Sequence, residues 1–404
     1  TKMKILFLTN LLPYPLDNGG KIKTYTTIKN FFDLGHEVDL MCFKENKDSM
    51  LVDECEILKI CKSVVQVYLP LTTVENKKYM INIAMKSIFS KKPFSIYKYK
   101  SKDFVQKLTD KSNNSYDIIY FDHLPMCVYL DLVRNLWPDT RIILDEHNCE
   151  SVITKRKEKE TKKIGKKIFL KLETIKLEKF EAESIKHVTK TIVLSNADYA
   201  SLKTLLNRDF IHEIIPIGVQ DRGLKKNNNN TELNILFIGT LTWEPNNLGL
   251  IWFLKEVIPI IEKERLSYHL YIVGKNPSND VRKICEKYKD RITITGYVES
   301  VDEYYDKCDL AIVPLFIGSG QRVKLIEAFS KGMPAISTEI GAEGLEYINN
   351  KNIVIANNKN DFARAIFLME DEELRFNIGN NARRNYDEFY SSRAISRLLE
   401  KAIS

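Results

Sequence analysis

The stretch DLAIVPLFIGSGQRVKLIEAFSKGMPAIST, residues 309–338, decides the fold class. Its first seven residues form a nearly continuous apolar run, which is typical of a strand buried on both faces of a parallel sheet. A loop with Gly318 and Gly320 follows, and then a helical segment that ends at Gly332, a typical residue after a helix C-terminus. A second apolar run comes next. The stretch therefore predicts a strand, a helix and another strand, the repeating unit of an α/β fold.

The same alternation of apolar runs and helical segments extends through both halves of the chain. In the first half, apolar runs that end in polar residues cover 4–10, 37–43, 117–122, 141–147 and 189–195. In the second half they cover 233–240, 268–274, 291–297, 309–315 and 333–338, with helical segments such as 247–264 and 322–331 between them. This α/β pattern predicts two tandem Rossmann-like domains, each a doubly wound parallel sheet.

A linker separates the two predicted domains. Residues 207–232 contain a proline, two glycines and four consecutive asparagines, a composition typical of a surface connection. Because ligands of open parallel sheets bind beyond the carboxyl ends of the strands, we expect the site in the cleft between the domains. The expected division is an N-terminal domain at 1–213, a linker at 214–232, a C-terminal domain at 233–385 and a C-terminal helix at 386–404 that packs back toward the N-terminal domain.

The helix after Gly320 starts with two cations, Arg322 and Lys324. A helix N-terminus carries partial positive charge, so each cation there costs about 0.3–1 kcal/mol. A bound anion reverses that sign, and the glycines before the helix leave backbone N–H groups open to it. The alternative is an ordinary surface pair between Lys324 and Glu327, which leaves Arg322 and the glycines unexplained. The motif therefore favours a diphosphate site.

Several motifs, in order along the chain, resemble one known family. Residues 318–345, GSGQRVKLIEAFSKGMPAISTEIGAEGL, are similar to the nucleotide-sugar motif of retaining GT-B glycosyltransferases of family four, which are group 1 glycosyltransferase-like. They match the branch with a G-x-G-x-R-x-K-x-x-E pattern. Residues 13–38 resemble the first glycine-rich loop and helix of that family, 214–219 its interdomain crossover, and 237–259 the start of its nucleotide domain. The resemblance covers nearly the whole chain and implies a GT-B fold with an interdomain cleft.

The resemblance also implies roles for individual donor-site residues. Arg322 and Lys324 would hold the donor's diphosphate and stabilise it as a leaving group, and Glu327 would bind the ribose hydroxyls. Gly20 would let the first domain's backbone approach the phosphates, although a plain turn glycine is the alternative. The backbone at Val298 would line the base. The other implied nucleotide-sugar-binding residues are Gly19, Gly239, Gly318, Ser319, Gly320 and Gln321.

One position departs from the family pattern. The pattern has a second glutamate eight residues before Glu327, and Ser319 stands at that position here. The usual glutamate contact with the donor sugar is therefore not expected, as is common in the Arg–Lys branch. The nucleotide half of the site is thus better defined by the sequence than the sugar half.

Two histidines, His123 and His147, stand at the carboxyl ends of neighbouring predicted strands in the first half. That position should turn both toward the cleft, and both are candidate catalytic residues. His123 matches the family's histidine that contacts the transferred sugar. The alternative for each is a structural hydrogen-bonding role. Asp122, Asp145 and Glu146 surround them, and any of the three could orient an imidazole or receive an acceptor proton.

Length and composition describe a soluble globular protein. The chain has 404 residues, too many for one ordinary core, with 44% hydrophobic and 28% charged residues. No apolar run approaches the roughly 20 residues of a membrane span, and the N-terminal run indicates a buried strand rather than a signal peptide. The seven cysteines form no C-x-x-C pair, so we expect reduced thiols, without a zinc site or disulfide framework.

The net charge of +7 is concentrated in two segments. Residues 76–102 hold eight Lys and no acid, and residues 151–190 hold thirteen Lys or Arg against six Glu, so the rest of the chain carries −8. Within 164–180, apolar residues form one helical stripe with lysines around it, which fits a helix on an anionic membrane surface. The alternative is a solvated cationic helix whose stripe packs on its own domain. We expect no nucleic-acid partner, because no recognition motif accompanies the charge.

The resemblance implies a retaining, metal-independent glycosyltransferase of hexosyltransferase type. It would move a sugar from a nucleotide-diphosphate-sugar donor to a glycan or lipid-linked acceptor in bacterial surface polysaccharide biosynthesis, in the cytoplasm or on the inner face of the membrane. No D-x-D motif lies near the predicted site, and Arg322 and Lys324 can supply the positive charge, so we expect no metal and no cofactor.

Other functions stay open at this point. A nucleotide-sugar epimerase shares the two-domain architecture, and a catalytically degenerate partner subunit would bind nucleotide without transferring sugar. A dinucleotide-dependent oxidoreductase is disfavoured, because no G-x-G-x-x-G motif follows the first predicted strand.

Overall fold

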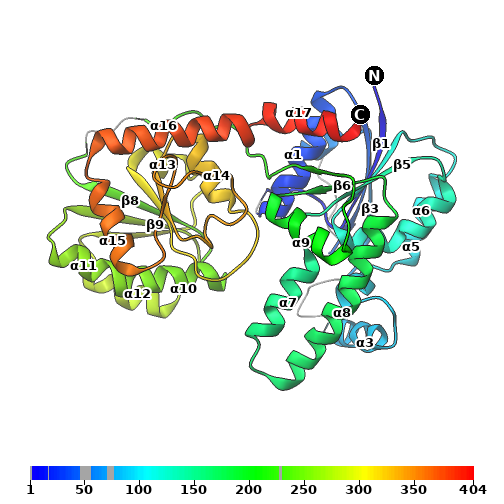
Figure 1. The fold of residues 1–404 in the computed structure, drawn as a ribbon, viewed down its shortest axis with the longest axis horizontal. Helices are drawn as coiled ribbons and strands as arrows, with labels where there is room; N and C mark the ends of the chain where they lie inside the picture. The colour runs from blue at the N-terminus through cyan, green and yellow to red at the C-terminus, as the bar shows by residue number, and fades with distance from the viewer. Residues whose placement is uncertain (1, 17, 46–55, 71–76, 227–229) are drawn as a thin grey trace. The chain divides into compact units, whose positions relative to one another are not determined.

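The computed structural model describes residues 2–16, 18–45, 56–70, 77–226 and 230–404. The chain forms two compact units (Figure 1). Unit 1 is Thr1–Ile217 together with Ile395–Ser404, and unit 2 is Gly218–Ala394. The linker predicted at 214–232 spans this division, and its residues 227–229 lie outside the described ranges. Each unit contains one parallel sheet with helices, so the predicted pair of Rossmann-like α/β domains is confirmed.

Unit 1 is built on a seven-stranded parallel sheet in the order β3-β2-β1-β4-β5-β6-β7. Its strands are β1 (Lys4–Thr9), β2 (Glu37–Lys44), β3 (Ser63–Tyr68), β4 (Ile118–Asp122), β5 (Arg141–Asp145), β6 (Lys190–Val193) and β7 (His212–Ile214). Its helices are α1 (Gly19–Asp33), α2 (Glu56–Ile60), α3 (Lys77–Ile88), α4 (Phe94–Tyr97), α5 (Lys102–Asp110), α6 (Leu130–Leu136), α7 (Glu150–Glu160), α8 (Ile164–Lys186) and α9 (Asn196–Leu206). Most of helix α17 (Ser392–Ile403) also belongs to this unit, from Ile395 onward.

Strand β1 illustrates how this sheet is buried on both faces. Ile5 and Phe7 pack in one core with residues of α1, α2 and α17. Leu6 and Leu8, which alternate with them, pack in the other core with residues of α4, α5, α8 and α9. Because successive side chains of a strand point to opposite faces, a strand between two layers of helices must be apolar throughout. This explains the near-continuous apolar runs of the sequence.

Unit 2 is built on a six-stranded parallel sheet in the order β10-β9-β8-β11-β12-β13. Its strands are β8 (Leu233–Ile238), β9 (Tyr268–Val273), β10 (Ile292–Gly296), β11 (Leu310–Val313), β12 (Ala335–Ser337) and β13 (Val354–Ile355). Its helices are α10 (Glu244–Trp252), α11 (Ile258–Lys263), α12 (Asn279–Cys285), α13 (Asp302–Lys307), α14 (Val323–Ser330), α15 (Lys359–Leu368) and α16 (Glu372–Phe389), with a π-helical turn (Phe253–Val257) between α10 and α11.

Three strands that the sequence did not predict, β3, β7 and β13, all lie at sheet edges. The residues of β3 and β7 are mostly half-buried, and β13 has only two residues. An edge strand has a neighbour on one side only, so it does not need the continuous apolar run by which the central strands were recognised.

The single helix expected at 386–404 is two helices in the structure. Helix α16 ends at Phe389, and the Ser391 hydroxyl then accepts a hydrogen bond from the backbone N–H of Ala394 (3.2 Å). A serine in this position caps the N-terminus of the next helix, which explains the break. Residues Ile395–Ser404 belong to unit 1.

Helix α8, with 23 residues, is as long as a membrane span. Lysines and glutamates recur along its whole length, however. Within the described ranges, no helix combines the length and the apolar character that crossing a bilayer requires.

Candidate functional site

The loop between β11 and α14 of unit 2 contains the glycines predicted for the anion site. Gly318 (φ 112°) and Gly320 (φ 84°) both have positive φ, which glycine adopts without strain. A Cβ atom at Gly318 would lie 2.9 Å from Nη2 of Arg322 and 3.5 Å from the ring of Trp243. The glycine therefore leaves room for a guanidinium group and an indole ring beside the loop.

Arg322 is the residue just before α14, with extended backbone, whereas the sequence placed it in the first turn. Only 6% of Arg322 is exposed. Its Nη1 donates to the backbone oxygen of Ser319, and its guanidinium lies over the ring of Trp243 at 5.5 Å. Nε and Nη2 have no hydrogen-bond partner among the described residues. Burial lowers the pKa of Arg322, but a guanidinium remains charged in proteins.

Lys324, in the first turn of α14, is half-buried beside this guanidinium. Its Nζ donates to Oδ1 of Asn246 (2.8 Å) and lies 5.2 Å from the ring centre of Phe237. Burial and then the charge of Arg322 lower the pKa of Lys324 to about 7. Gly239 leaves room for the Asn246 side chain that Lys324 contacts, because a Cβ atom at Gly239 would lie 2.5 Å from the amide nitrogen of Asn246.

The two cations are withdrawn from water without a carboxylate in contact, although the charge of Glu343 acts on Arg322 and that of Glu327 on Lys324 from farther away. In the part of the chain that the structure describes, neither forms an ion pair with a carboxylate, and their hydrogen bonds go to a backbone and an amide oxygen. A buried charge without a counter-ion costs several kcal/mol. An anion beside the glycine loop would supply the missing partners, as the sequence predicted.

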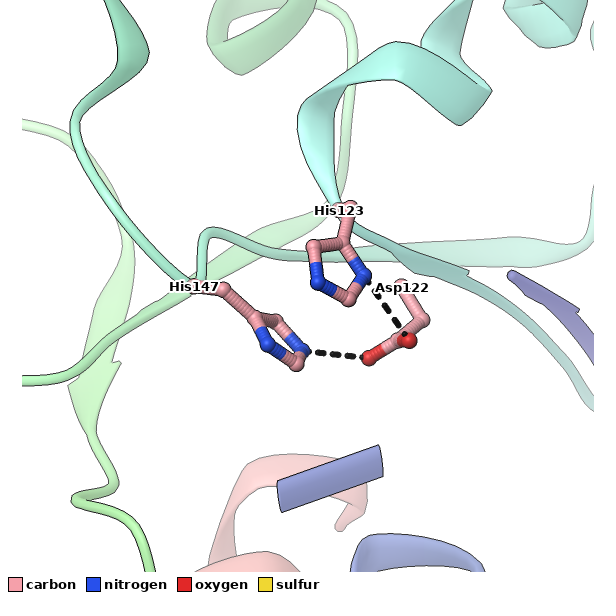
Figure 2. A group of neighbouring side chains, drawn as sticks. All are labelled: Asp122, His123 and His147. Atoms are coloured by element: carbon pink, nitrogen blue, oxygen red, sulfur yellow. Dashed lines mark hydrogen bonds and ion pairs between the residues drawn. The ribbon is translucent and has the colours of Figure 1, made fainter. Parts of the chain in front are cut away.

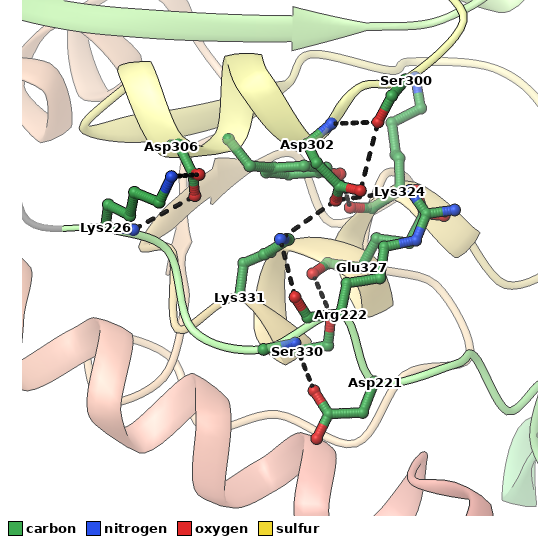
Figure 3. Close-up of polar contacts among 12 residues, drawn as sticks. Asp221, Arg222, Lys226, Ser300, Asp302, Asp306, Lys324, Glu327, Ser330 and Lys331 are labelled. Carbon is green, nitrogen blue, oxygen red and sulfur yellow. Dashed lines mark hydrogen bonds and ion pairs between the residues drawn. The ribbon is translucent and has the colours of Figure 1, made fainter.

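Glu327, one turn after Lys324, faces Arg222 instead of that lysine (Figure 3). Nη2 of Arg222 lies 3.8 Å from Oε1 of Glu327, and its Nη1 lies 3.7 Å from Oδ1 of Asp302, which also pairs with Lys331. Burial raises the pKa of Glu327, although Arg222 acts against the shift. The alternative of a simple surface pair between Lys324 and Glu327 is therefore wrong.

Two other predicted donor-site residues, Gln321 and Val298, belong to different loops of unit 2. Gln321 is buried and donates from Nε2 to the backbone oxygen of Gly344 (2.6 Å). Val298 follows β10, the edge strand, which is separated from β11 by β9 and β8. The contacts bring together Gly239, Gly318, Ser319, Arg322 and Lys324.

In unit 1, Asp122, His123 and His147 form one cluster at the carboxyl ends of the neighbouring strands β4 and β5 (Figure 2). Nδ1 of His123 lies 3.0 Å from Oδ2 of Asp122, and Nε2 of His147 lies 2.6 Å from Oδ1 of the same carboxylate. The two imidazole rings stack with their centres 3.5 Å apart. Asp122 thus orients both histidines, one of the possibilities that the sequence left open.

Asp122 is fully buried and accepts two more hydrogen bonds, from the hydroxyls of Thr9 (2.6 Å) and Thr24 (2.7 Å). Burial alone would raise the pKa of Asp122, but His147 and His123 hold it well below its ordinary range. Burial would lower the pKa of His123, yet Asp122 more than offsets this and raises it. For His147, burial and the neighbouring His123 prevail and lower the pKa to about 4. His123 is therefore the imidazole that holds a proton more firmly.

His123 is also the more accessible histidine, with 17% of its side chain exposed against 4% for His147. Its φ of 75° is rare for a residue other than glycine, and such conformations concentrate at functional sites. A Cβ atom at Gly20 would lie 3.7 Å from Nε2 of His123, so the predicted glycine loop and histidine meet. Gly19 begins helix α1 just before. Gly20 and His123 line a cavity of about 150 Å³ with Asn10, Lys21, Glu45 and Tyr99.

The histidine cluster also has the donor types of a metal site, since nitrogen and oxygen atoms of Asp122, His123 and His147 lie within 4.8 Å of one another. A metal bound to imidazole lies in the ring plane, about 2.0–2.1 Å from nitrogen. The two rings here are stacked, and their planes are tilted by only 26°. No position therefore lies in both ring planes at that distance from a nitrogen of each ring. The arrangement fits shared hydrogen bonds to one carboxylate better than joint coordination of an ion.

Sequence reasoning missed two supporting residues of unit 1, Lys23 and Tyr120. Lys23 forms a buried ion pair with Asp145, which also accepts a hydrogen bond from Tyr120 (2.6 Å). Glu146 is buried, and neither of its carboxylate oxygens has a hydrogen-bond partner among the described residues. Of the three acids that the sequence proposed as partners, Asp122 alone has its carboxylate hydrogen-bonded to the imidazole rings in the described structure, while the backbone oxygen of Asp145 accepts from the backbone N–H of His123 (3.0 Å).

In unit 2, Trp243 and Asn246 were missed as well. Both belong to the stretch TLTWEPNN just after Gly239, at the start of α10. Polar residues directly after a buried strand could have indicated them, because the carboxyl ends of parallel strands carry the binding loops.

Most of unit 2 matches a known protein family. Residues 232–371 match the family model described as Glycosyl transferases group 1. A curated relative, an uncharacterized 44.6 kDa protein in the cps region of Klebsiella pneumoniae, is 27% identical over 401 residues, which cover 95% of this chain and 96% of the relative. Unit 2 therefore carries a group 1 glycosyl transferase domain, as the resemblance predicted.

Solved structures share the fold over the whole chain. Sucrose-phosphate synthase of Thermosynechococcus elongatus matches with a TM-score of 0.73 at 16% identity, over 99% of this chain and 98% of that one. HepE of Anabaena in complex with UDP and glucose matches at 0.64 and 13%, over 99% and 98%. A TarM mutant of S. aureus, in a complex that contains UDP, matches at 0.61 and 15%, over both chains completely. The expected GT-B fold is confirmed.

Proposed function

We propose that this protein is a retaining glycosyltransferase that moves a sugar from a nucleoside-diphosphate sugar to a glycan or lipid-linked acceptor in surface polysaccharide biosynthesis. The observation that carries the proposal is the buried, partly unpartnered guanidinium of Arg322 beside Lys324, within a group 1 glycosyl transferase domain. Two findings support it further: HepE was solved with UDP-glucose, and the Klebsiella relative is encoded in a cps region.

Arg322 and Lys324 would act by stabilising the departing diphosphate. In the transfer, the bond between the anomeric carbon and the diphosphate oxygen breaks, and a bond to the acceptor oxygen forms on the same face of the sugar. The electron pair remains on the diphosphate, whose growing charge the two cations offset, and a diphosphate oxygen takes the acceptor's proton. Glu327 would accept hydrogen bonds from the ribose, and His123, held by Asp122, would donate one to the transferred sugar.

The same reasoning covers the cofactor and the location. Two cations at the diphosphate can do the electrostatic work of a metal ion, so we propose a metal-independent reaction without a cofactor. A lipid-linked acceptor and a nucleotide-sugar donor meet at the inner face of the cytoplasmic membrane, and we place the protein there.

Nucleotide binding tests the proposal most directly. Thermal shift with UDP, GDP, TDP, ADP and CMP should show one nucleoside diphosphate that stabilises the wild-type protein but not Arg322→Ala. No shift with any of them would contradict the donor site. Turnover of the donor to an epimer without acceptor would identify an epimerase instead, and binding without transfer or hydrolysis would identify a degenerate subunit.

A further inference from the structure

Two helices of unit 1, α3 and α8, expose apolar side chains that soluble proteins usually bury. Phe89, directly after α3, is 91% exposed, and Ile164 at the start of α8 is 77% exposed. In each case the exposed residues recur every four positions, so they form one stripe along a helix. The stripes include Ile81, Met85 and Phe89 at α3, and Ile164, Ile168 and Leu172 on α8. We call this surface the α3–α8 face.

Helices α3 and α8, which carry the two stripes, lie side by side in unit 1 (Figure 1), and α8 holds the end of α3. Nζ of Lys176 donates to the backbone oxygens of Ser87 (2.8 Å) and Ile88 (3.1 Å), the last residues of α3. Glu173 accepts a hydrogen bond from the backbone N–H of Phe94 (2.9 Å), where α4 begins. A lysine at a helix C-terminus and an acid at a helix N-terminus are both favourable. The two helices that carry the α3–α8 face are therefore fixed to each other.

The α3–α8 face is cationic as well as apolar. Lys78, Lys86 and Lys91, on or just after α3, are exposed, and residues 77–102 contain no Asp or Glu. Residue 76 of the predicted basic segment lies outside the described ranges. Of the four glutamates of α8, Glu173 and Glu181 are buried, and the other two each pair with a lysine. Exposed lysines around the start of α8 are Lys162, Lys163, Lys166, Lys167 and Lys171.

We propose that the α3–α8 face docks on an anionic lipid bilayer. Its isoleucine, leucine and phenylalanine side chains would enter the boundary between headgroups and acyl chains, while the lysines extend to the phosphates. A nucleic acid would match the charge but not the apolar stripes. A second copy would match the stripes but would bring two lysine-rich faces together. The inference rests on the membrane location proposed above and names the surface involved, but bilayer binding requires no sugar transfer, so either can fail without the other.

Co-sedimentation of the full chain with vesicles tests the surface. Vesicles with about one-third phosphatidylglycerol should bind the protein, and pure phosphatidylcholine vesicles should bind it at least about tenfold more weakly. The double variant Ile168→Glu with Leu172→Glu should lose at least about tenfold in binding to the anionic vesicles. Both positions are exposed, so the variant should fold normally.

A matched control is available in unit 2. Leu368 and Phe376 are 52% and 60% exposed, and the double variant Leu368→Glu with Phe376→Glu should bind vesicles like the wild type. Higher salt should weaken the wild-type binding, because screening shortens the reach of the lysines. Equal binding of wild type and Ile168→Glu/Leu172→Glu would overturn the proposal. So would dimerisation that this variant abolishes, in a protein that does not bind vesicles.

Discussion

The two candidate clusters of this protein differ in whether their buried charged groups have hydrogen-bond partners. In unit 1, Asp122 accepts hydrogen bonds from two hydroxyls and two imidazoles. In unit 2, Arg322 leaves Nε and Nη2 unpartnered among the described residues, and Lys324 reaches one amide oxygen. The carboxylate of the first cluster is fully hydrogen-bonded by the protein itself, whereas the cations of the second lack partners that an anion would supply.

Under the proposed function, this difference separates a cluster that stabilises the fold from one that binds substrate. A satisfied buried network contributes to stability and fixes the orientation of its members. A buried cation without partners lowers stability, and a ligand that supplies the partners gains that free energy on binding. Substitutions in the two clusters should therefore have opposite effects on the ligand-free protein.

The largest effect is expected for Asp122→Asn. It replaces the shared acceptor of His123 and His147 with a neutral amide whose nitrogen cannot accept, so the free energy of unfolding should fall by about 3–5 kcal/mol. Urea denaturation measures the change, with Asp209→Asn at an exposed position as the control. Nucleotide binding by the folded variant should be unchanged. A loss below about 1 kcal/mol would contradict the network described here.

Arg322→Ala should have the next largest effect, on binding. Loss of charge-assisted hydrogen bonds should weaken the preferred nucleoside diphosphate about 100-fold in calorimetry. Unlike Asp122→Asn, the variant should not reduce the stability of the ligand-free protein, because it removes an unpaired buried charge. Arg364→Ala, at an exposed arginine, is the control. A Kd within about threefold of the wild type would refute the assignment.

The pH dependence of binding should be smaller, about tenfold per pH unit, and should arise from Lys324. Its pKa of about 7 in the free protein means that binding above pH 7 must take up a proton, so affinity should fall as pH rises from about 7 to 9. Lys324→Gln should remove this slope.

The same group sets a pH dependence of stability. The pKa of Lys324 is lower in the folded protein than its ordinary value near 10.5, so the unfolded chain binds more protons between about 7 and 10.5. This contribution therefore makes the ligand-free protein more stable as pH rises through that window. For the binding prediction of the preceding paragraph, an unchanged nucleotide affinity in calorimetry from pH 7 to 9 would show that Lys324 stays charged in the free protein.

The smallest effect is expected from metal removal. Because the histidine cluster is complete through hydrogen bonds and two cations serve the diphosphate, EDTA should leave the transfer rate within about twofold. A tenfold loss that a divalent cation restores would show that the stacked histidines rearrange to bind metal.

The glycine loop and its two cations were predictable from sequence because their signal is local. Arg322 and Lys324 conflict with the dipole of the helix that they start, and the nearby glycines show that backbone groups are left open. Nothing further along the chain is needed to read that conflict. The central strands were equally readable, because each is apolar on both faces.

The partners of these groups were not predictable, because they come from distant positions. Asn246 is 78 residues from Lys324, and Lys23 is 122 residues from Asp145. Only the folded sheet brings such residues together. The sequence alone does not distinguish a lysine that becomes buried on folding from one that stays on the surface. Edge strands such as β3 were not predicted for a different, local reason: their half-buried residues do not form the continuous apolar run that identified the central strands.

The membership of Ile395–Ser404 in unit 1 has a consequence for how the protein is made. Ile395, Leu399 and Ile403 are buried in the same core as β1, and Arg141 donates from Nη1 to the backbone oxygen of Ile403 (2.7 Å). During synthesis, all of unit 2 leaves the ribosome before this last piece of unit 1. The unit that begins first is therefore finished last, and a fragment ending at Ile217 would lack part of its own core.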